Sequence, residues 1–394
     1  MKKILAILSL LLAAVAGVSA QQPVGGTDSA RVSIVICSPG SNVYELEGHA
    51  ALRVVLPDGR DIAVNYGIFD FDSPNFIYRF VKGETDYMVA AYPFRIFVDG
   101  YRREGREVVE YPLNLTAAES ERLVALLNEN LLPEKRVYRY NYVKDNCSTR
   151  VLDLVEKAVG DSAALHAPEF SSGWSFRDAM RYYHVNYPWY QFGIDLALGN
   201  GIDYPLSEHE KVFAPAILMD MLPSATLSDG RLLAGTPVMH SSDNGGGPFA
   251  PTLWPLTPMA VSLYVLVGVV VCAVADLRRR RVSRWADAVF MSVAGLAGCL
   301  LAFLVFVSTH EATSPNWLIV WLNPLCFIVP VCIFIKKCAR LVFCYEIVNF
   351  VALFLLCVLW PLTGQTANGA FWPLIAADMI LSARYIYISH AQKN

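Results

Sequence analysis

The sequence is poor in charged residues. Asp, Glu, Lys and Arg make up 17% of its 394 residues, whereas hydrophobic residues make up 55%. A typical soluble chain carries about 25% charged residues. This composition excludes an intrinsically disordered chain and disfavours an ordinary cytosolic enzyme. The net charge of −3 provides no excess of positive charge, so the composition also argues against nucleic acid as a partner.

Several catalytic signatures are also missing. The chain has no C-x-x-C pair, no H-E-x-x-H motif, no G-x-S-x-G motif and no P-loop. Metal, nucleotide and serine-hydrolase chemistry therefore lack sequence support. We expect no metal site and no cofactor.

The first 20 residues are predicted to be a secretory signal peptide. Lys2 and Lys3 precede an apolar run over residues 4–15, and small residues at 18–20 stand before Gln21. This order of a positive, an apolar and a small-residue segment is typical of exported proteins. The alternative is an uncleaved membrane anchor, which would export the following residues equally.

The rest of the chain changes composition along its length. Residues 21–240 have a soluble composition, and we expect them to form an α+β periplasmic domain. Residues 241–256 are rich in Gly and Pro and predict a linker. Residues 257–394 hold five apolar runs, each long enough to cross a bilayer, which predict an all-α bundle of five transmembrane helices. The runs are 259–275, 286–307, 317–335, 341–362 and 371–388.

The positive charges between these runs predict their orientation. The cluster at 278–281 follows the first run, and Lys336 and Lys337 follow the third, whereas the loops 310–316 and 364–370 contain no Lys or Arg. Positive loops remain in the cytoplasm. We therefore expect a multi-pass protein of the bacterial inner membrane, with residues 21–240 in the periplasm and the C-terminus in the cytoplasm.

The predicted exported domain contains only two cysteines. In an oxidising compartment, Cys37 and Cys147 could form one disulfide. Their contexts differ, however, because Cys37 ends a strand-like run and Cys147 follows Asn146, a good helix N-cap. The apolar spacing after Cys147 predicts a helix that ends at Gly160. At a helix start, the dipole and the N–H groups favour a thiolate and can hold an oxyanion.

A thiol nucleophile needs a base, and His49 is a candidate. Residues 47–56 and 60–67 predict two strands joined by a three-residue loop, with Gly59 in the left-handed conformation. This register pairs Leu56 with Arg60, and it places Asn65 on the same face as His49. The Asn65 amide would then orient the imidazole, as the third member of a catalytic triad does.

Several motifs together resemble the Lnb family. They cover essentially the whole predicted exported domain and part of the membrane domain. The matching segments are Gly48-His49-Ala50, residues 65–69, residues 140–149 with Asp145-Asn146-Cys147, Ser175-Phe176-Arg177-Asp178, Pro188-Trp189, residues 192–195, Thr309-His310-Glu311 and Asn316-Trp317. The order of His before Cys, with Asn-Cys opening a helix, also looks like the circularly permuted papain-like enzymes.

The resemblance implies a lipoprotein N-acyltransferase. Such an enzyme moves an acyl chain from a phospholipid, through a thioester on Cys147, to the α-amine of the N-terminal cysteine of a diacylated lipoprotein. Its partners would be the phospholipid, the lipoprotein and the membrane. Cys147, His49 and Asn65 would be catalytic. The candidate substrate-binding residues are Asn146, Trp189, His310 and Asn316.

Two other functions remain open from the sequence. A periplasmic cysteine amidase or peptidase of the cell wall would use the same Cys147 and His49. A non-enzymatic membrane assembly factor would instead hold Cys37 and Cys147 in a structural disulfide.

Overall fold

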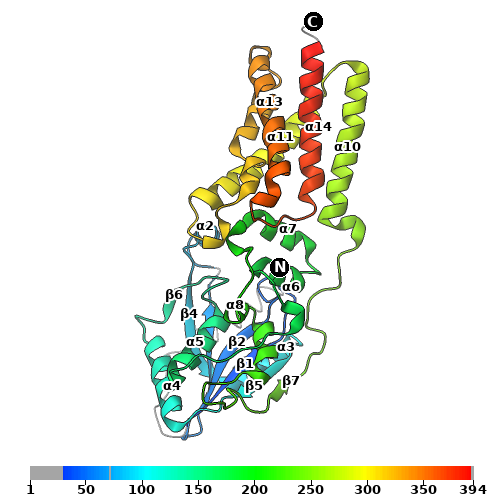
Figure 1. Ribbon diagram of the computed structural model, residues 1–394. Helices are drawn as coiled ribbons and strands as arrows, with labels where there is room; N and C mark the ends of the chain where they lie inside the picture. Colours follow the sequence, from blue (N-terminus) through cyan, green and yellow to red (C-terminus); the bar gives the residue numbers. More distant parts are fainter. Residues whose placement is uncertain (1–29, 71, 392–394) are drawn as a thin grey trace. The chain divides into compact units, whose positions relative to one another are not determined.

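The computed structural model describes residues 30–70 and 72–391 (Figure 1). The predicted signal peptide lies outside the described residues. By compactness the chain forms two units. The first contains Met1–Pro74, Thr85–Ser172 and Ser207–Pro248, and the second contains Asn75–Glu84, Gly173–Leu206 and Phe249–Asn394. The second unit therefore includes two stretches of the predicted exported domain. The boundaries of the compact units differ from the domain boundaries that the sequence predicts.

The first unit is built on a seven-stranded antiparallel sheet. The strand order is β6-β4-β3-β2-β1-β5-β7. The strands are β1 (Arg31–Cys37), β2 (His49–Val55), β3 (Asp61–Ile68), β4 (Asp86–Pro93), β5 (Val108–Pro112), β6 (Val137–Arg139) and β7 (Val238–Ser241).

The β2–β3 hairpin has the register that the sequence predicts. Val54 pairs with Ile62, and the Leu56 N–H donates to the Arg60 carbonyl oxygen. Gly59 has a φ of 86°, the left-handed conformation that a three-residue loop requires. The prediction that His49 and Asn65 share one face of the sheet is confirmed.

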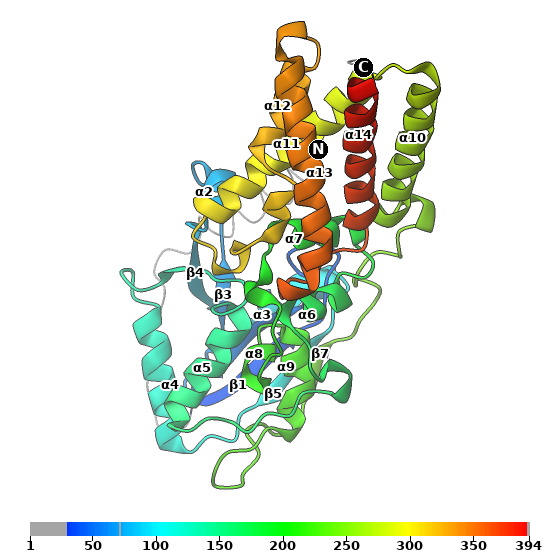
Figure 2. The ribbon, with the colours of Figure 1, turned by 45° about the horizontal axis from the view of Figure 1, so that its top comes forward.

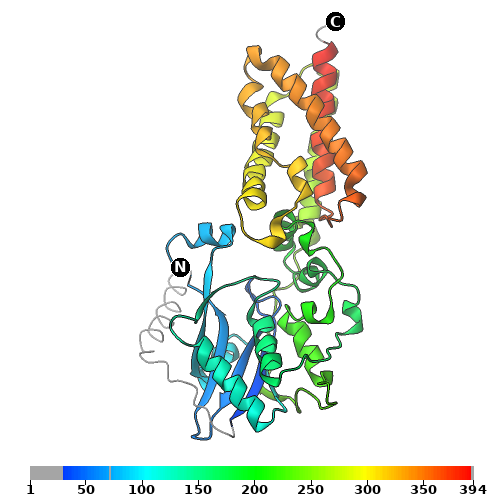
Figure 3. The same ribbon diagram turned by 60° about the vertical axis from the view of Figure 1, so that its left-hand side comes forward.

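Helices cover both faces of this sheet. Helix α3 (Phe94–Arg103) packs its apolar side against Val35, Cys37, Ala51 and Ala63. Helices α4 (Ala117–Asn130) and α5 (Cys147–Val159) cover the opposite face (Figure 3). On that face, Asn130 donates a hydrogen bond to the Tyr66 hydroxyl. The short helices α8 (Glu208–Lys211) and α9 (Pro215–Met221) complete the unit, and α9 contacts β1, β2 and α5.

The second unit is helical. Four of its helices are long and apolar enough to cross a membrane, and Figure 2 shows them together. They are α10 (Pro258–Arg279), α11 (Arg284–Phe306), α13 (Ala339–Leu359) and α14 (Phe371–Ala391). The shorter helices are α2 (Phe76–Lys82), α6 (Phe176–Tyr183), α7 (Pro188–Ala197) and α12 (Ile328–Cys332).

The third predicted span is not a continuous helix. Residues 317–332 form two short 3₁₀ turns, Trp317–Val320 and Pro324–Phe327, followed by α12. The break has a local cause, because Pro324 has no N–H to donate and the Asn323 side chain instead caps the next turn by accepting from the Leu325 N–H. The described residues thus contain four long apolar helices and one shorter apolar segment, and the expectation of five full-length transmembrane helices is not confirmed.

Buried polar side chains connect the long helices. Arg384 of α14 pairs with Asp276 of α10 and with Asp287 of α11. Asn349 of α13 donates to Asp378 of α14 at 2.8 Å. Ionisable groups at membrane depth are tolerated when they face one another in this way.

Candidate active site

The start of α5 positions Cys147. Asn146 is the N-cap, and its Oδ1 accepts from the Ser148 and Thr149 N–H groups, at 2.9 and 3.1 Å. Its Nδ2 donates to the carbonyl oxygens of Tyr142 and Phe213, at 2.8 Å each. The predicted helix start at Cys147 is confirmed. Because these bonds engage both ends of the Asn146 amide, its observed role is positioning, and a contact with substrate remains a prediction.

The Cys147 thiol lies beside the ends of β2 and β3. Its sulfur is within hydrogen-bonding reach of the backbone N–H groups of Ala50, Cys147 and Ser148. Gly67 has a φ of 86°, and a methyl group added there would lie 3.7 Å from the Cys147 Cβ. Gly48 has a φ of 90°, and a side chain there would lie 2.7 Å from the Cys37 carbonyl oxygen. Both glycines have the left-handed conformation that a side chain disfavours, and at Gly48 a side chain would also clash with the Cys37 carbonyl oxygen.

The thiol is buried, and burial decides its protonation. Burial raises the pKa of Cys147 to about 11, while the three backbone N–H groups act against this rise and the Glu47 carboxylate adds to it. The expectation that the helix start lowers the pKa of this thiol is therefore wrong for the free protein, because desolvation outweighs the N–H groups. Cys147 is a neutral thiol at pH 7, and it needs a base at the moment of attack.

His49 and Asn65 form the pair that the hairpin register predicts. His49 Nε2 and Asn65 Oδ1 are 2.6 Å apart, and Asn65 Nδ2 donates to the Tyr92 hydroxyl at 2.9 Å. The second bond fixes the amide, so Asn65 accepts from the His49 Nε2–H. The imidazole then carries its lone pair on Nδ1, which is the atom that can accept a proton.

The His49 ring is held in an aromatic environment. It stacks on Tyr101 with centroids 6.1 Å apart, and Phe97 lies at 6.4 Å. The pKa of His49 is lowered to about 4, chiefly by burial and to a lesser extent by the Arg106 guanidinium, whereas the bond to Asn65 opposes the shift. The ring is therefore neutral at pH 7 and can act as a base.

No hydrogen bond joins the imidazole to the Cys147 thiol among the residues that the structure describes, and the ring bonds to Asn65 alone. The ring stacks on Phe97 and Tyr101 of α3, whereas Cys147 begins α5, which covers the opposite face of the sheet, so direct proton transfer between the two side chains belongs to the proposal and not to the observed contacts. The roles of Cys147, His49 and Asn65 in catalysis remain predictions. The structure itself provides a buried thiol, an oriented neutral imidazole and a set of N–H groups within one unit.

Sequence reasoning did not identify Glu47 as part of this region. Glu47 is only 5% exposed, and it accepts a hydrogen bond from the Tyr142 hydroxyl. The Ala216 N–H donates to the Glu47 carbonyl oxygen, which holds the segment before β2. A carboxylate near a reactive thiol is not visible in the sequence, since only tertiary packing buries Glu47 and brings Tyr142 to it.

The other predicted substrate-binding residues belong to the second unit. Trp189 is half exposed, and its Nε1 donates to the Leu256 carbonyl oxygen at 2.8 Å. His310 Nε2 lies 2.8 Å from the Phe80 carbonyl oxygen. Asn316 is buried, donates to Leu196 and caps the turn at Leu318. Their contacts with substrate remain predictions.

The Cys37 and Cys147 thiols are both free. Cys37 lies on the face of the sheet that α3 covers. Within the described residues, no group of three His, Cys, Asp or Glu side chains could hold a metal ion.

Two family models match the chain. The model of the Lnb N-terminal periplasmic domain matches residues 23–176, and the model of the Lnb transmembrane domain matches residues 250–393. The two matches follow one another in chain order and together span most of the sequence. No curated protein and no solved structure matches the chain significantly.

Proposed function

Because the chain belongs to the Lnb family, with a periplasmic domain followed by a membrane domain, we propose that it is a lipoprotein N-acyltransferase with Cys147 as its nucleophile. One observation carries this proposal: a buried thiol at a helix start, surrounded by backbone N–H groups, lies in the same unit as an imidazole that an amide orients. This combination suits acyl transfer through a covalent intermediate.

The first half-reaction would acylate Cys147. His49 Nδ1 takes the thiol proton as sulfur attacks the ester carbonyl carbon of a phospholipid. The backbone N–H groups of Cys147 and Ala50 stabilise the developing oxyanion. The ester C–O bond then breaks, and His49 returns the proton to the leaving lysophospholipid hydroxyl. A thioester on Cys147 remains.

The second half-reaction would transfer the acyl chain to the lipoprotein. The neutral α-amine of the lipid-modified cysteine attacks the thioester carbonyl, the C–S bond breaks and an amide forms. His49 carries the amine proton to the leaving sulfur. A free α-amine has a pKa of about 7.7 to 8.0, so deprotonating it near neutral pH is inexpensive.

The order of the site residues supports a permuted papain-like arrangement. His49 begins β2, Asn65 lies on β3 and Cys147 begins α5, so the base precedes the nucleophile in the chain. The antiparallel sheet packs against the helix that carries the thiol. We include this arrangement in the proposal as the geometric basis of the chemistry.

Intact-mass analysis of the purified protein would test the chemistry. After incubation with phospholipid, we expect a mass gain of one acyl chain, which hydroxylamine removes and which peptide mapping places on Cys147. Cys147→Ser should show no labile adduct, and Cys37→Ser is the matched control that should acquire it normally. If both variants acquire the adduct, Cys147 is not the nucleophile. If wild-type protein acquires none from any phospholipid, the proposed donor is wrong.

The predicted orientation can be tested at the broken third segment. If residues 317–335 cross the membrane, a reporter fused after Arg284 is cytoplasmic, a reporter after Gln365 is periplasmic, and the C-terminus is in the cytoplasm. If only the four long helices cross, both reporters lie on the same side. We expect opposite sides, because Lys336 and Lys337 follow this segment and favour its cytoplasmic end.

A further inference from the structure

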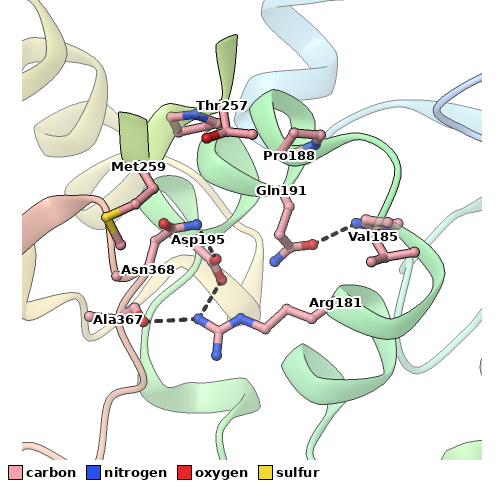
Figure 4. Close-up of a pocket in the computed structure, with 12 residues that line it drawn as sticks. Arg181, Val185, Pro188, Gln191, Asp195, Thr257, Met259, Ala367 and Asn368 are labelled. Carbon is pink, nitrogen blue, oxygen red and sulfur yellow. Dashed lines mark hydrogen bonds and ion pairs between the residues drawn. The ribbon is translucent and has the colours of Figure 1, made fainter. Parts of the chain in front are cut away.

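The second unit contains a pocket at the ends of two membrane helices. Its volume is about 310 Å³, and its lining includes Arg181, Gln191 and Asp195 together with residues around Pro258 and Asn368. Pro258 begins α10, and Asn368 lies three residues before α14 begins. Both helices are candidate membrane spans, and if they cross the bilayer, the pocket lies where lipid headgroups meet the hydrocarbon core. Figure 4 shows the side chains of Arg181, Gln191 and Asp195 converging in it.

Gln191 brings an unused donor to this pocket. The residue is 7% exposed, and His184 Nδ1 lies 2.7 Å from its Oε1. The Gln191 Nε2 is itself buried in the wall of the pocket, and no acceptor among the described residues lies within hydrogen-bonding distance of it. A buried donor without an acceptor is costly, which indicates that a ligand supplies the acceptor.

The acceptors already present in the pocket are occupied. Asp195 accepts from Arg177 at 2.9 Å, from Arg181 at 3.2 Å and from Asn368 at 2.9 Å. Arg177 also pairs with Asp203 at 2.7 Å, so the two arginines and the two aspartates balance in charge. Arg181 also donates to the Ala367 carbonyl oxygen at 3.1 Å, so the pocket offers the remaining N–H groups of Arg181 and the Gln191 N–H as donors, and no uncompensated charge of either sign. A ligand with acceptor oxygens fits it, and a cation does not.

The surface near the pocket is apolar and exposed. Val185 is 71% exposed, Leu256 61% and Met259 37%, and the outward side of α10 continues with apolar residues such as Leu263 and Val267. Apolar side chains at the end of a membrane helix suit contact with acyl chains. The pocket itself is too small for a lipid with two acyl chains, so it would hold only the polar part while the chains lie along α10.

We propose that this pocket binds the phosphate and glycerol part of a phospholipid, with Gln191 and Arg181 as donors to the phosphate oxygens. Arginine and amide N–H groups donate hydrogen bonds to phosphate oxygens. Identifying this phospholipid as the acyl donor rests on the proposed function, whereas its binding does not.

The test uses the full chain in detergent and native mass spectrometry to count bound lipid. Phosphatidylethanolamine is the probe, and diacylglycerol and inorganic phosphate are the comparison ligands. Gln191→Glu keeps an oxygen for His184 and replaces the free donor with an acceptor, but it also adds one buried negative charge, so its thermal unfolding midpoint must match that of wild type before their lipid binding is compared. Arg181→Met removes the second donor, and Arg95→Met, an exposed arginine of the first unit, is the control for loss of one positive charge.

Wild-type protein and Arg95→Met should bind phosphatidylethanolamine equally, and each pocket variant should bind it at least about tenfold more weakly. Equal binding by wild type and both pocket variants would overturn the proposal. So would equal binding of diacylglycerol and phosphatidylethanolamine, because diacylglycerol lacks the phosphate. Complete displacement of the lipid by an equal concentration of inorganic phosphate would mean that the pocket binds phosphate and not a phospholipid.

The pocket and the chemistry are distinguished by a second measurement. Acylation of Cys147 by a short, water-soluble thioester needs no lipid headgroup, so Gln191→Glu should react with it at the wild-type rate. Lost reaction with phospholipid and retained reaction with the soluble donor supports the pocket as the donor site. If no donor acylates wild-type Cys147, the proposed function fails, and the lipid-binding result still decides the pocket.

Discussion

The depressed pKa of His49 predicts an unusual resistance of the acylation step to acid. The perturbation is a change from pH 7 to pH 5 at saturating phospholipid. His49 has a pKa of about 4, because burial and Arg106 disfavour the imidazolium ion. The Cys147 thiol has a pKa of about 11, so it is neutral throughout this range. The only group of the pair that could titrate between pH 7 and pH 5 is therefore the imidazole.

The expected magnitude follows from the two protonation equilibria. An imidazole with the ordinary pKa of about 6.5 is neutral for about three quarters of the population at pH 7 but for only about 3% at pH 5. An imidazole with a pKa of about 4 is still about 90% neutral at pH 5. The acylation rate should therefore fall by no more than about twofold, instead of about 25-fold.

The assay is single-turnover formation of the hydroxylamine-labile adduct, followed by intact mass at several pH values. Acid also weakens the fold, because the unfolded chain protonates His49 near pH 6.5 and the folded chain does so only near pH 4. This difference costs about 3 kcal/mol of stability between those pH values and none above them. Protein returned from pH 5 to pH 7 must therefore recover full activity for the comparison to be valid.

An acid limb with a midpoint near pH 6.5, in protein that recovers fully, would refute the reasoning. It would mean that the base is exposed to water or that another histidine serves as the base. A plateau down to pH 5, lost in His49→Ala at every pH, would support His49 as the base.

Three further predictions concern individual side chains. Cys147→Ser should lower turnover by at least about 10³-fold, whereas Cys37→Ser should change it by no more than about twofold. Turnover is measured from the lipoprotein that retains a free α-amine, and equal losses in the two variants would favour the disulfide alternative. Glu47→Gln should raise the rate at which iodoacetamide alkylates Cys147 about two- to threefold, because removing a negative charge lowers the pKa of the thiol. An unchanged rate would mean that Glu47 does not influence the thiol. Asn65→Ala should lower kcat about 10- to 100-fold with little change in KM, because the imidazole loses its orientation; a wild-type kcat would remove Asn65 from the mechanism.

Local patterns explain what the sequence predicted well. The hairpin register depends on a turn residue, Gly59, and on alternation along two adjacent strands, so it is visible within 20 residues. The start of α5 depends on Asn146 and on the apolar spacing up to Gly160, which is equally local. These two elements suffice to place His49 beside Asn65 and to place Cys147 at a helix start.

Long-range packing explains what the sequence did not predict. Hydropathy averages over residues 317–335 and so misses the helix break at Pro324. The segment Asn75–Glu84 belongs to the second unit because Thr309 donates its N–H to the Lys82 carbonyl oxygen at 2.8 Å, and His310 lies against Phe80. Contacts between residues more than 200 positions apart leave no periodic signal in either segment.

The protonation state of Cys147 also depends on long-range packing that the sequence does not reveal, and this state constrains the mechanism. A helix start is readable from the sequence, but the burial that raises the pKa of Cys147 to about 11 is not. The pKa of His49 is about 4, so the two pKa values differ by roughly seven units. Moving the proton from the thiol to the imidazole in the resting site therefore costs about 10 kcal/mol, not counting the attraction between the two ions that it forms. A resting thiolate–imidazolium pair is therefore a minor species. Proton transfer must accompany attack on the ester, when the negative charge passes from sulfur to the carbonyl oxygen and the N–H groups of Ala50 and α5 can stabilise it.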